Sequence, residues 1–155
     1  MLTLADLYFM KTIYDAAARD ELIKRIQKIN DQSVAKWGKM TAYQMVRHCT
    51  MWEDMMQGKI IYKRSFLGKL FGKMALRNVL TKAELGKGSP TIPQFKIKGT
   101  GNIAAEKVRW IELISQHASK TDIHIQHPFF GDINKDQIGI LIYKHTDHHL
   151  RQFNN

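Results

Sequence analysis

Apolar residues recur every three or four positions along several stretches of this chain, which is the pattern of helices that bury one face. The spacing predicts helices over residues 16–29, 42–57, 66–81, 103–117 and 134–153. A short additional helix is expected before Asp15. Alternating apolar and polar residues, the pattern of strands, occur only at residues 95–98 and predict at most a minor strand. The chain is therefore predicted to be all-α, with an antiparallel four-helix bundle as its core.

Residues that begin and end helices support these boundaries. Thr41 with Gln44, and Asn134 with Gln137, have the spacing of capping boxes, in which side chains and backbone N–H groups pair at a helix start. Gly58 follows the second helix, a position where glycine commonly ends a helix. These signals indicate that the second and last helices are the best defined.

The inward faces of two helices are predicted from their apolar residues. In the helix over 66–81, six residues are expected to face the core: Phe66, Leu67, Leu70, Phe71, Met74 and Ala75. Lys69, Lys73 and Arg77 recur every four residues and are expected at the surface. Two glycines in this helix weaken its prediction. In the helix over 103–117, the residues expected to face inward are Val108, Ile111 and Ile114.

The length of 155 residues suits one domain over 1–155, with residues 1–14 as an N-terminal extension. Residues 86–101 contain four glycines and two prolines, which predicts a long irregular connection between the third and fourth helical segments, free enough to act as a lid. Cys49 is the only cysteine, no apolar run is long enough for a membrane span, and the start has no basic leader. These features favour the cytoplasm.

The net charge of +10 is concentrated in the middle of the chain. Residues 59–98 hold ten Lys or Arg and one acid, Glu84. Lys69, Lys73 and Arg77 are therefore candidates for binding an anion, an acidic partner, a membrane surface or nucleic acid. Nucleic acid is the weakest of these, because no aromatic residues interleave with the basic face and no recognition-helix motif is present. A solvated basic face without a ligand is the simpler alternative.

Two histidines four residues apart, His145 and His149, share one face of the last predicted helix. They continue a line of apolar residues that ends at Ile142, so they are expected to point into the core. Two imidazoles do not complete a metal site, because a catalytic zinc-type site uses three protein ligands and an open position. His48, on the inward stripe of the second helix, is the best third ligand.

Three motifs carry a resemblance to a known group. They are Trp37-Gly38-Lys39-Met40-Thr41 ahead of the helix with His48, then His127-Pro128-Phe129-Phe130-Gly131, and finally Tyr143-Lys144-His145-Thr146-Asp147-His148-His149-Leu150-Arg151-Gln152-Phe153. From about Asp15 onward, the chain resembles bacterial proteins of the DinB-like superfamily of metal-binding four-helix bundles. The two end motifs are specific when taken together.

The resemblance implies a function for the three histidines. The superfamily includes transferases and isomerases that use bacillithiol, mycothiol or glutathione. Its usual ligands, one histidine from the second helix and an H-x-x-x-H pair from the last, fall on His48, His145 and His149. Members often continue the pair as His-Arg-x-Gln, whereas Leu150 occupies the arginine position here. The role of that arginine therefore does not carry over to Arg151.

Further residues are candidates for supporting the ligands or lining a pocket. Gln152, near the end of the last helix, and Trp52, one turn after His48, lie on the inward stripes. His127 is a candidate for the pocket mouth, and a hydrogen-bonded loop histidine is the alternative. Cys49 has apolar neighbours and is expected to be buried and unreactive.

These observations lead to two hypotheses. The first is an enzyme that holds a divalent ion, with Zn²⁺ or Ni²⁺ favoured, and performs thiol transfer or hydrolysis on a small-molecule substrate, with a low-molecular-weight thiol as a second cofactor. The second is a non-catalytic DinB-like module whose basic middle segment binds an anionic partner. No residue specifies the thiol or its electrophilic partner, and the sequence leaves a homodimer open.

Overall fold

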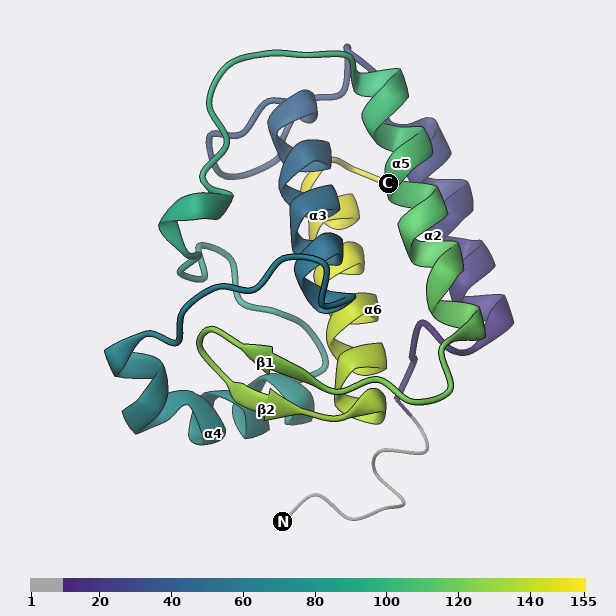
Figure 1. The fold of residues 1–155 in the computed structure, drawn as a ribbon. Coiled ribbons are helices and arrows are strands. Elements are labelled where there is room, and N and C mark those ends of the chain that lie inside the picture. Colours follow the sequence, from purple (N-terminus) through teal and green to yellow (C-terminus); the bar gives the residue numbers. More distant parts are fainter. Residues whose placement is uncertain (1–9) are drawn as a thin grey trace.

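The computed structural model describes residues 10–155, whose regular elements are mostly helices (Figure 1). The helices are α2 (Ala16–Lys28), α3 (Ala42–Met56), α4 (Phe66–Thr81), α5 (Ile103–Gln116) and α6 (Lys135–Gln152). Two short strands, β1 (Ile125–His127) and β2 (Gly131–Ile133), and two 3₁₀ turns, Pro93–Phe95 and His117–Ser119, accompany them. The mainly helical prediction is confirmed. The short helix predicted before Asp15 falls largely on residues 1–9, outside the described part of the chain.

Four of the helices lie side by side, with α2 and α6 running in one direction and α3 and α5 in the other (Figure 1). Both α2 and α3 pack against α5 and α6. Their inward side chains form a buried cluster that includes Leu22, Ile26, Met45, Met56, Trp110, Ile114, Ile138, Ile142 and Leu150. Removing these apolar side chains from water is the main stabilising contribution to such a core.

The predicted helix ends are confirmed. Thr41 with Gln44, and Asn134 with Gln137, both form complete capping boxes at the starts of α3 and α6. Gly58 follows α3 with a φ of 72°, a conformation that glycine adopts without steric cost. Local interactions therefore fix the residues at which α3 and α6, the two helices that carry the candidate histidines, begin.

The sequence pattern did not predict a hairpin that closes one end of the molecule. Strand β1 pairs antiparallel with β2, with Ile125 opposite Ile133 and His127 opposite Gly131. Each strand has only three residues, so the alternation is too short to stand out against the helical periodicity. Figure 1 shows the hairpin lying between α4 and the lower ends of α3 and α6.

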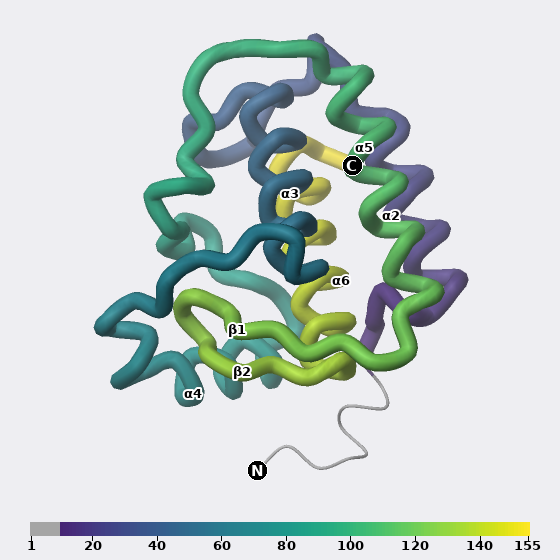
Figure 2. Tube along the Cα trace, viewed as in Figure 1, coloured from purple at the N-terminus to yellow at the C-terminus, as the bar shows by residue number. Residues whose placement is uncertain are grey.

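The chain between α4 and α5, residues 82–102, rises along the outside of α3 (Figure 2). It forms the long irregular connection predicted over residues 86–101. The minor strand expected at residues 95–98 does not form; the 3₁₀ turn Pro93–Phe95 lies at its start, and the side chain of Phe95 is buried. The connection is thus pinned to α3 near its middle.

The predicted orientation of α4 is wrong. The large apolar residues expected in the core are exposed by 49–73%, namely Phe66, Leu67, Leu70, Phe71 and Met74. The residues that face inward are Gly68, Gly72, Leu76 and Leu80. The prediction that Lys69, Lys73 and Arg77 lie at the surface is confirmed.

Two glycines explain this orientation. Gly68 and Gly72 lie against the backbone of Phe129, in the turn of the hairpin, where a Cβ on either glycine would overlap the Phe129 carbonyl oxygen. The backbone N–H of Ser65 also donates to the carbonyl of Pro128 at 2.9 Å. Close backbone approach, and not apolar side chains, therefore decides which face of α4 packs.

The other end of α4 is held by Lys144 of α6. The Nζ of this buried lysine donates to the carbonyl oxygens of Val79, Leu80 and Lys82 at 3.0, 2.8 and 2.5 Å. Such a cation satisfies carbonyls that the helix end leaves without partners and complements the helix dipole. Since both ends of α4 are anchored, its outward face is a fixed feature of the fold.

The predicted face of α5 is also partly wrong. Val108 was expected inward but is 58% exposed, whereas Trp110 and Leu113 are buried. Ile114 is buried as predicted, and Ile111 packs at the edge of the core. The tryptophan, which has the largest apolar area in this helix, therefore sets its rotation.

No helix in the described part of the chain is both long enough and apolar enough to cross a membrane.

Candidate metal centre

Three predicted histidines meet between α3 and α6. His48 lies on α3 and His145 and His149 lie one turn apart on α6, and each offers one nitrogen within 4.8 Å of the nitrogens of the other two. The Nε2 atoms of His48 and His145 are 3.1 Å apart. The capping boxes that start α3 and α6 set the positions of these residues along both helices.

The spacing of the imidazoles fits a shared divalent ion. Two nitrogens bound to zinc at 2.0–2.1 Å with a tetrahedral angle lie roughly 3.3 Å apart. The distance of 3.1 Å between the Nε2 atoms of His48 and His145 is close to this value. No carboxylate or thiol belongs to the cluster, so the donor set among the described residues is three imidazoles. This set suits Zn²⁺, Ni²⁺ or a similar ion.

Hydrogen bonds orient two of the three rings. The Nδ1 of His48 lies 3.0 Å from the carbonyl oxygen of Phe95, and the Nδ1 of His149 lies 2.9 Å from Oε1 of Gln152. Both acceptors require a proton on Nδ1, which leaves Nε2 with its lone pair. The Nε2 of Gln152 donates to the carbonyl of Trp37 at 2.8 Å, which fixes the amide. Such partners orient metal-binding histidines in known sites.

His145 is held by stacking. Its ring lies parallel to the indole of Trp52, with centroids 4.1 Å apart and planes inclined by 13°. Its Nδ1 is buried without a hydrogen-bond partner, although the residue as a whole is only partly buried. Its Nε2 faces His48. A buried nitrogen without a hydrogen-bond partner costs free energy, because it would form a hydrogen bond with water if it were exposed. The packing of Trp52 and the other neighbours against the ring must therefore outweigh this cost.

Burial keeps the three imidazoles neutral. It lowers the pKa of His48, lowers that of His145 well below its usual range, and lowers that of His149 to about 3. Repulsion between the histidines adds to this effect on the pKa of His145 and His149. Neutral imidazole is the form that binds metal ions. At neutral pH, the three imidazoles therefore carry no positive charge that would repel a metal cation.

His127 occupies a structural position in the hairpin. Its Nδ1 accepts hydrogen bonds from the backbone N–H groups of Phe129 and Phe130, both at 3.1 Å, and its ring stacks on Phe130. Burial lowers its pKa to about 4. These contacts account for the residue without a ligand, and its role at a pocket mouth stays a prediction.

Cys49 is buried beside the ligand His48 but points to a different environment. Its Sγ lies 3.8 Å from the sulfur of Met45, and the side chain is 1% exposed. Burial, followed by the nearby charge of Glu53, raises the pKa of the thiol well above its usual value. A thiol in this state is a poor nucleophile.

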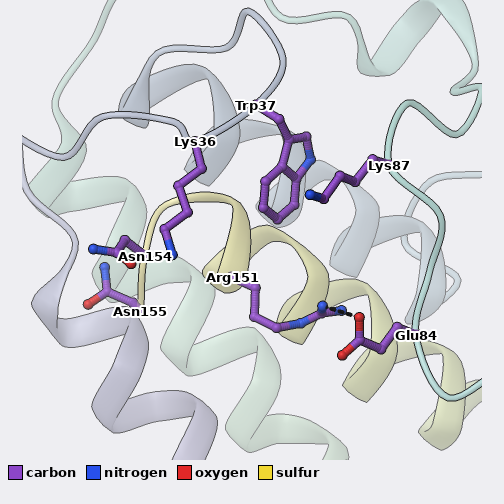
Figure 3. A pocket seen from close by; sticks show the side chains of 7 residues that line it. All are labelled: Lys36, Trp37, Glu84, Lys87, Arg151, Asn154 and Asn155. Atoms are coloured by element: carbon purple, nitrogen blue, oxygen red, sulfur yellow. Dashed lines mark hydrogen bonds and ion pairs between the residues drawn. The ribbon is translucent and has the colours of Figure 1, made fainter.

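A hollow of about 520 Å³ lies next to the residues that support His149 (Figure 3). It is lined by Lys36, Trp37, Glu84, Lys87, Arg151, Asn154 and Asn155. Arg151 is paired with Glu84 at 2.5 Å, and the Nζ of Lys87 lies over the Trp37 ring at 4.6 Å. The three histidines do not line this hollow, which is joined to them through Trp37 and Gln152.

Sequence reasoning missed two supporting residues, Phe95 and Trp37. Both act through backbone carbonyls, which carry no side-chain signal. The only available hint for Trp37 was its place in the motif Trp37–Thr41, and Phe95 was assigned to a minor strand. The anion-binding candidates Lys69, Lys73 and Arg77 lie on α4, are exposed, and are not part of the histidine cluster.

Comparison with known proteins gives a family and no characterised relative. No curated protein and no solved structure matches the chain. A family model described as "Protein of unknown function (DUF1569)" matches residues 11–155, which include the three histidines and all the helices described above. The chain therefore belongs to the DUF1569 family.

Proposed function

We propose that this protein is a metal-dependent enzyme of the DinB-like type, built on a four-helix bundle of α2, α3, α5 and α6. The observation that supports it best is the convergence of His48, His145 and His149, with the Nδ1 atoms of His48 and His149 hydrogen-bonded to protein acceptors and the Nε2 atoms of His48 and His145 3.1 Å apart. In the proposed role, these three Nε2 atoms hold a divalent ion, with Zn²⁺ or Ni²⁺ favoured.

A divalent ion in such a site supplies Lewis-acid chemistry, because it lowers the pKa of a coordinated water or thiol toward neutral pH. The protein residues supply the rest. Phe95 and Gln152 keep the protons of His48 and His149 on Nδ1, and Trp52 holds His145 in position. Thiol transfer or hydrolysis of a small electrophilic substrate is the reaction class that follows.

In this proposal, the hollow beside Trp37 binds an anionic group of the substrate. Arg151 is neutralised by Glu84, but Lys36 and Lys87 also line the space. A carboxylate of a low-molecular-weight thiol would be attracted there. Cys49 has no role in this proposal, because it is buried and its pKa is raised.

The test begins with the metal content of protein purified without a histidine tag, measured by inductively coupled plasma mass spectrometry. We expect about one ion per chain in the wild type and none in the variant His48→Ala/His145→Ala/His149→Ala. His124→Ala, which removes an exposed histidine outside the cluster, is the matched control and keeps the metal. Equal metal content in the triple variant and the wild type would refute the site.

The reaction is tested with the metal-loaded protein against a panel of low-molecular-weight thiols and electrophiles. We expect turnover that is lost in His149→Ala and kept in Cys49→Ser. Activity that is lost in Cys49→Ser but kept in His149→Ala would overturn the mechanism. If the wild type binds metal and is inactive across a broad panel, the alternative gains weight, in which the chain is a non-catalytic DinB-like module.

A further inference from the structure

Helix α4 presents an unusual surface. Its face opposite the hairpin carries the exposed residues Phe66, Leu67, Leu70, Phe71 and Met74. At about 100° per residue, these α4 side chains centre on the direction opposite to Gly68, Gly72 and Leu76. No residue among 10–155 covers this face. Contiguous exposed apolar surfaces of this kind mark interaction sites.

Basic residues follow one flank of the apolar face. Lys69, Lys73 and Arg77 lie at successive turns of the helix and are exposed. Within the described part of the chain, none of the three forms an ion pair. Glu84, the single acid of residues 59–98, is bound to Arg151. The surface is therefore both apolar and positively charged.

The orientation of α4 is held by the fold. Gly68 and Gly72 pack on the backbone of Phe129, and Lys144 binds the carbonyls at the helix end. The helix lies at one end of the molecule, across the direction of α2, α3, α5 and α6 (Figure 1). A helix placed in this way can bring its whole apolar face onto a flat surface at once.

We propose that the outward face of α4 docks on an anionic lipid bilayer, with the helix parallel to the membrane plane. In this position the apolar side chains enter the boundary between headgroups and acyl chains, while the basic side chains reach the phosphates. This surface function is separate from the proposed chemistry at the histidines.

Charge decides against a second copy of the chain as the occupant. In a symmetric contact through α4, Lys69, Lys73 and Arg77 would approach the same residues of the other copy, and α4 carries no acid to pair with them. An anionic bilayer offers both an apolar layer and negative charge, and each Lys or Arg near its surface strengthens binding.

The experiment is co-sedimentation of the full chain with vesicles. Phosphatidylcholine vesicles with and without phosphatidylglycerol are compared at low and high salt. We expect binding to the anionic vesicles, little binding to phosphatidylcholine alone, and weakening by salt. Absence of binding to the anionic vesicles at low salt would overturn the proposal.

Matched variants test the two halves of the surface. We expect Leu70→Ser/Met74→Ser to weaken vesicle binding about tenfold, with Val108→Ser, an exposed apolar residue on α5, unchanged. Lys69→Gln/Lys73→Gln should weaken binding about tenfold, with the equally spaced exposed pair Lys24→Gln/Lys28→Gln close to the wild type.

Other occupants give different results. If the wild type is a dimer without vesicles and the Leu70→Ser/Met74→Ser variant is a monomer, the face is a contact between copies and the proposal is wrong. If the protein binds heparin as strongly as vesicles, and the Leu70→Ser/Met74→Ser change weakens neither interaction, the face binds polyanions through charge alone and the proposal is wrong. Circular dichroism and metal content are measured on every variant, so that failure here is separable from failure of the metal centre.

Discussion

Helices α6 and α4 both repeat apolar residues at helical spacing, but α6 buries its stripe in the core and α4 presents its stripe to solvent. In α6 the stripe passes through Ile138 and Ile142 and continues into the histidines. In α4 the buried line consists of Gly68, Gly72, Leu76 and Leu80. Periodicity therefore shows that a helix has an apolar face, and the element that packs against the helix decides whether that face is buried in the core.

The difference originates in what each helix packs against. The side chains of α6 meet side chains of α2 and α3, and large apolar residues fill that space best. The glycines of α4 meet the backbone of Phe129 in the hairpin turn, and small residues allow that approach. The buried face of α6 carries two of the candidate metal ligands, whereas the outward face of α4 is exposed to solvent.

The largest stability effect should follow from truncating the buried stripe. Ile142 is fully buried in α6, whereas Leu70 on α4 is 61% exposed. Ile142→Ala should lower the free energy of unfolding by about 2–5 kcal/mol, because it removes buried contacts and leaves a cavity. Leu70→Ala should change it by less than about 0.5 kcal/mol. Urea denaturation of both variants measures this, and equal losses would contradict the assigned orientations.

A smaller loss is expected from a glycine of α4. Gly72→Ala should lower the free energy of unfolding by about 1–3 kcal/mol, because the new methyl group would overlap the Phe129 carbonyl. Helix propensity alone predicts a gain of about 1 kcal/mol for the same change. Gly86→Ala, where a Cβ meets only the Ser89 hydroxyl at 3.7 Å, is the control. A more stable Gly72→Ala protein would show that α4 is not packed at this position.

The helices and their ends could be predicted from the sequence because capping and periodicity are local. Thr41, Asn134 and Gly58 act on neighbouring residues, so their signals are complete in the sequence. The orientation of α4 could not be predicted, because it depends on Phe129, more than fifty residues away in the chain. The three-residue strands were too short to give a period.

The candidate site shows the same division. His145 and His149 are local partners on one helix, and His48 was found through the stripe of α3. The carbonyls of Phe95 and Trp37, which orient the imidazole of His48 and the amide of Gln152, depend on how distant loops return to the helices. Backbone groups of this kind are present at every residue, so their selection is a property of the fold alone.

Metal affinity should respond to the residue that supports His149. Gln152→Ala removes the acceptor for Nδ1 of His149 and the donor to Trp37, and is expected to weaken metal binding about 10–100-fold. Lys73→Gln on the exposed side of α4 should leave the affinity unchanged. Competition with a chromophoric chelator measures both variants. Unchanged affinity in Gln152→Ala would show that this hydrogen bond does not orient a ligand.

The smallest effect concerns the hairpin on which α4 rests. His127 accepts two backbone hydrogen bonds through Nδ1, and burial lowers its pKa to about 4, below the value of about 6.5 in an unfolded chain. Between these values the unfolded chain binds a proton that the folded protein does not. The stability from this residue is therefore complete above pH 6.5 and is lost as the pH falls toward 4. From pH 7 to 5.5, this loss should be about 1 kcal/mol in the metal-free protein.

The control is His127→Asn, which keeps an acceptor at the same place and does not titrate, so the free energy of unfolding of this variant should fall less over this range. Parallel denaturation curves in a chelating buffer compare the two proteins, which cancels the contribution of the three buried histidines between α3 and α6. An equal fall in both would show that His127 is protonated in the folded hairpin, and the backbone N–H groups of Phe129 and Phe130 would then need another acceptor.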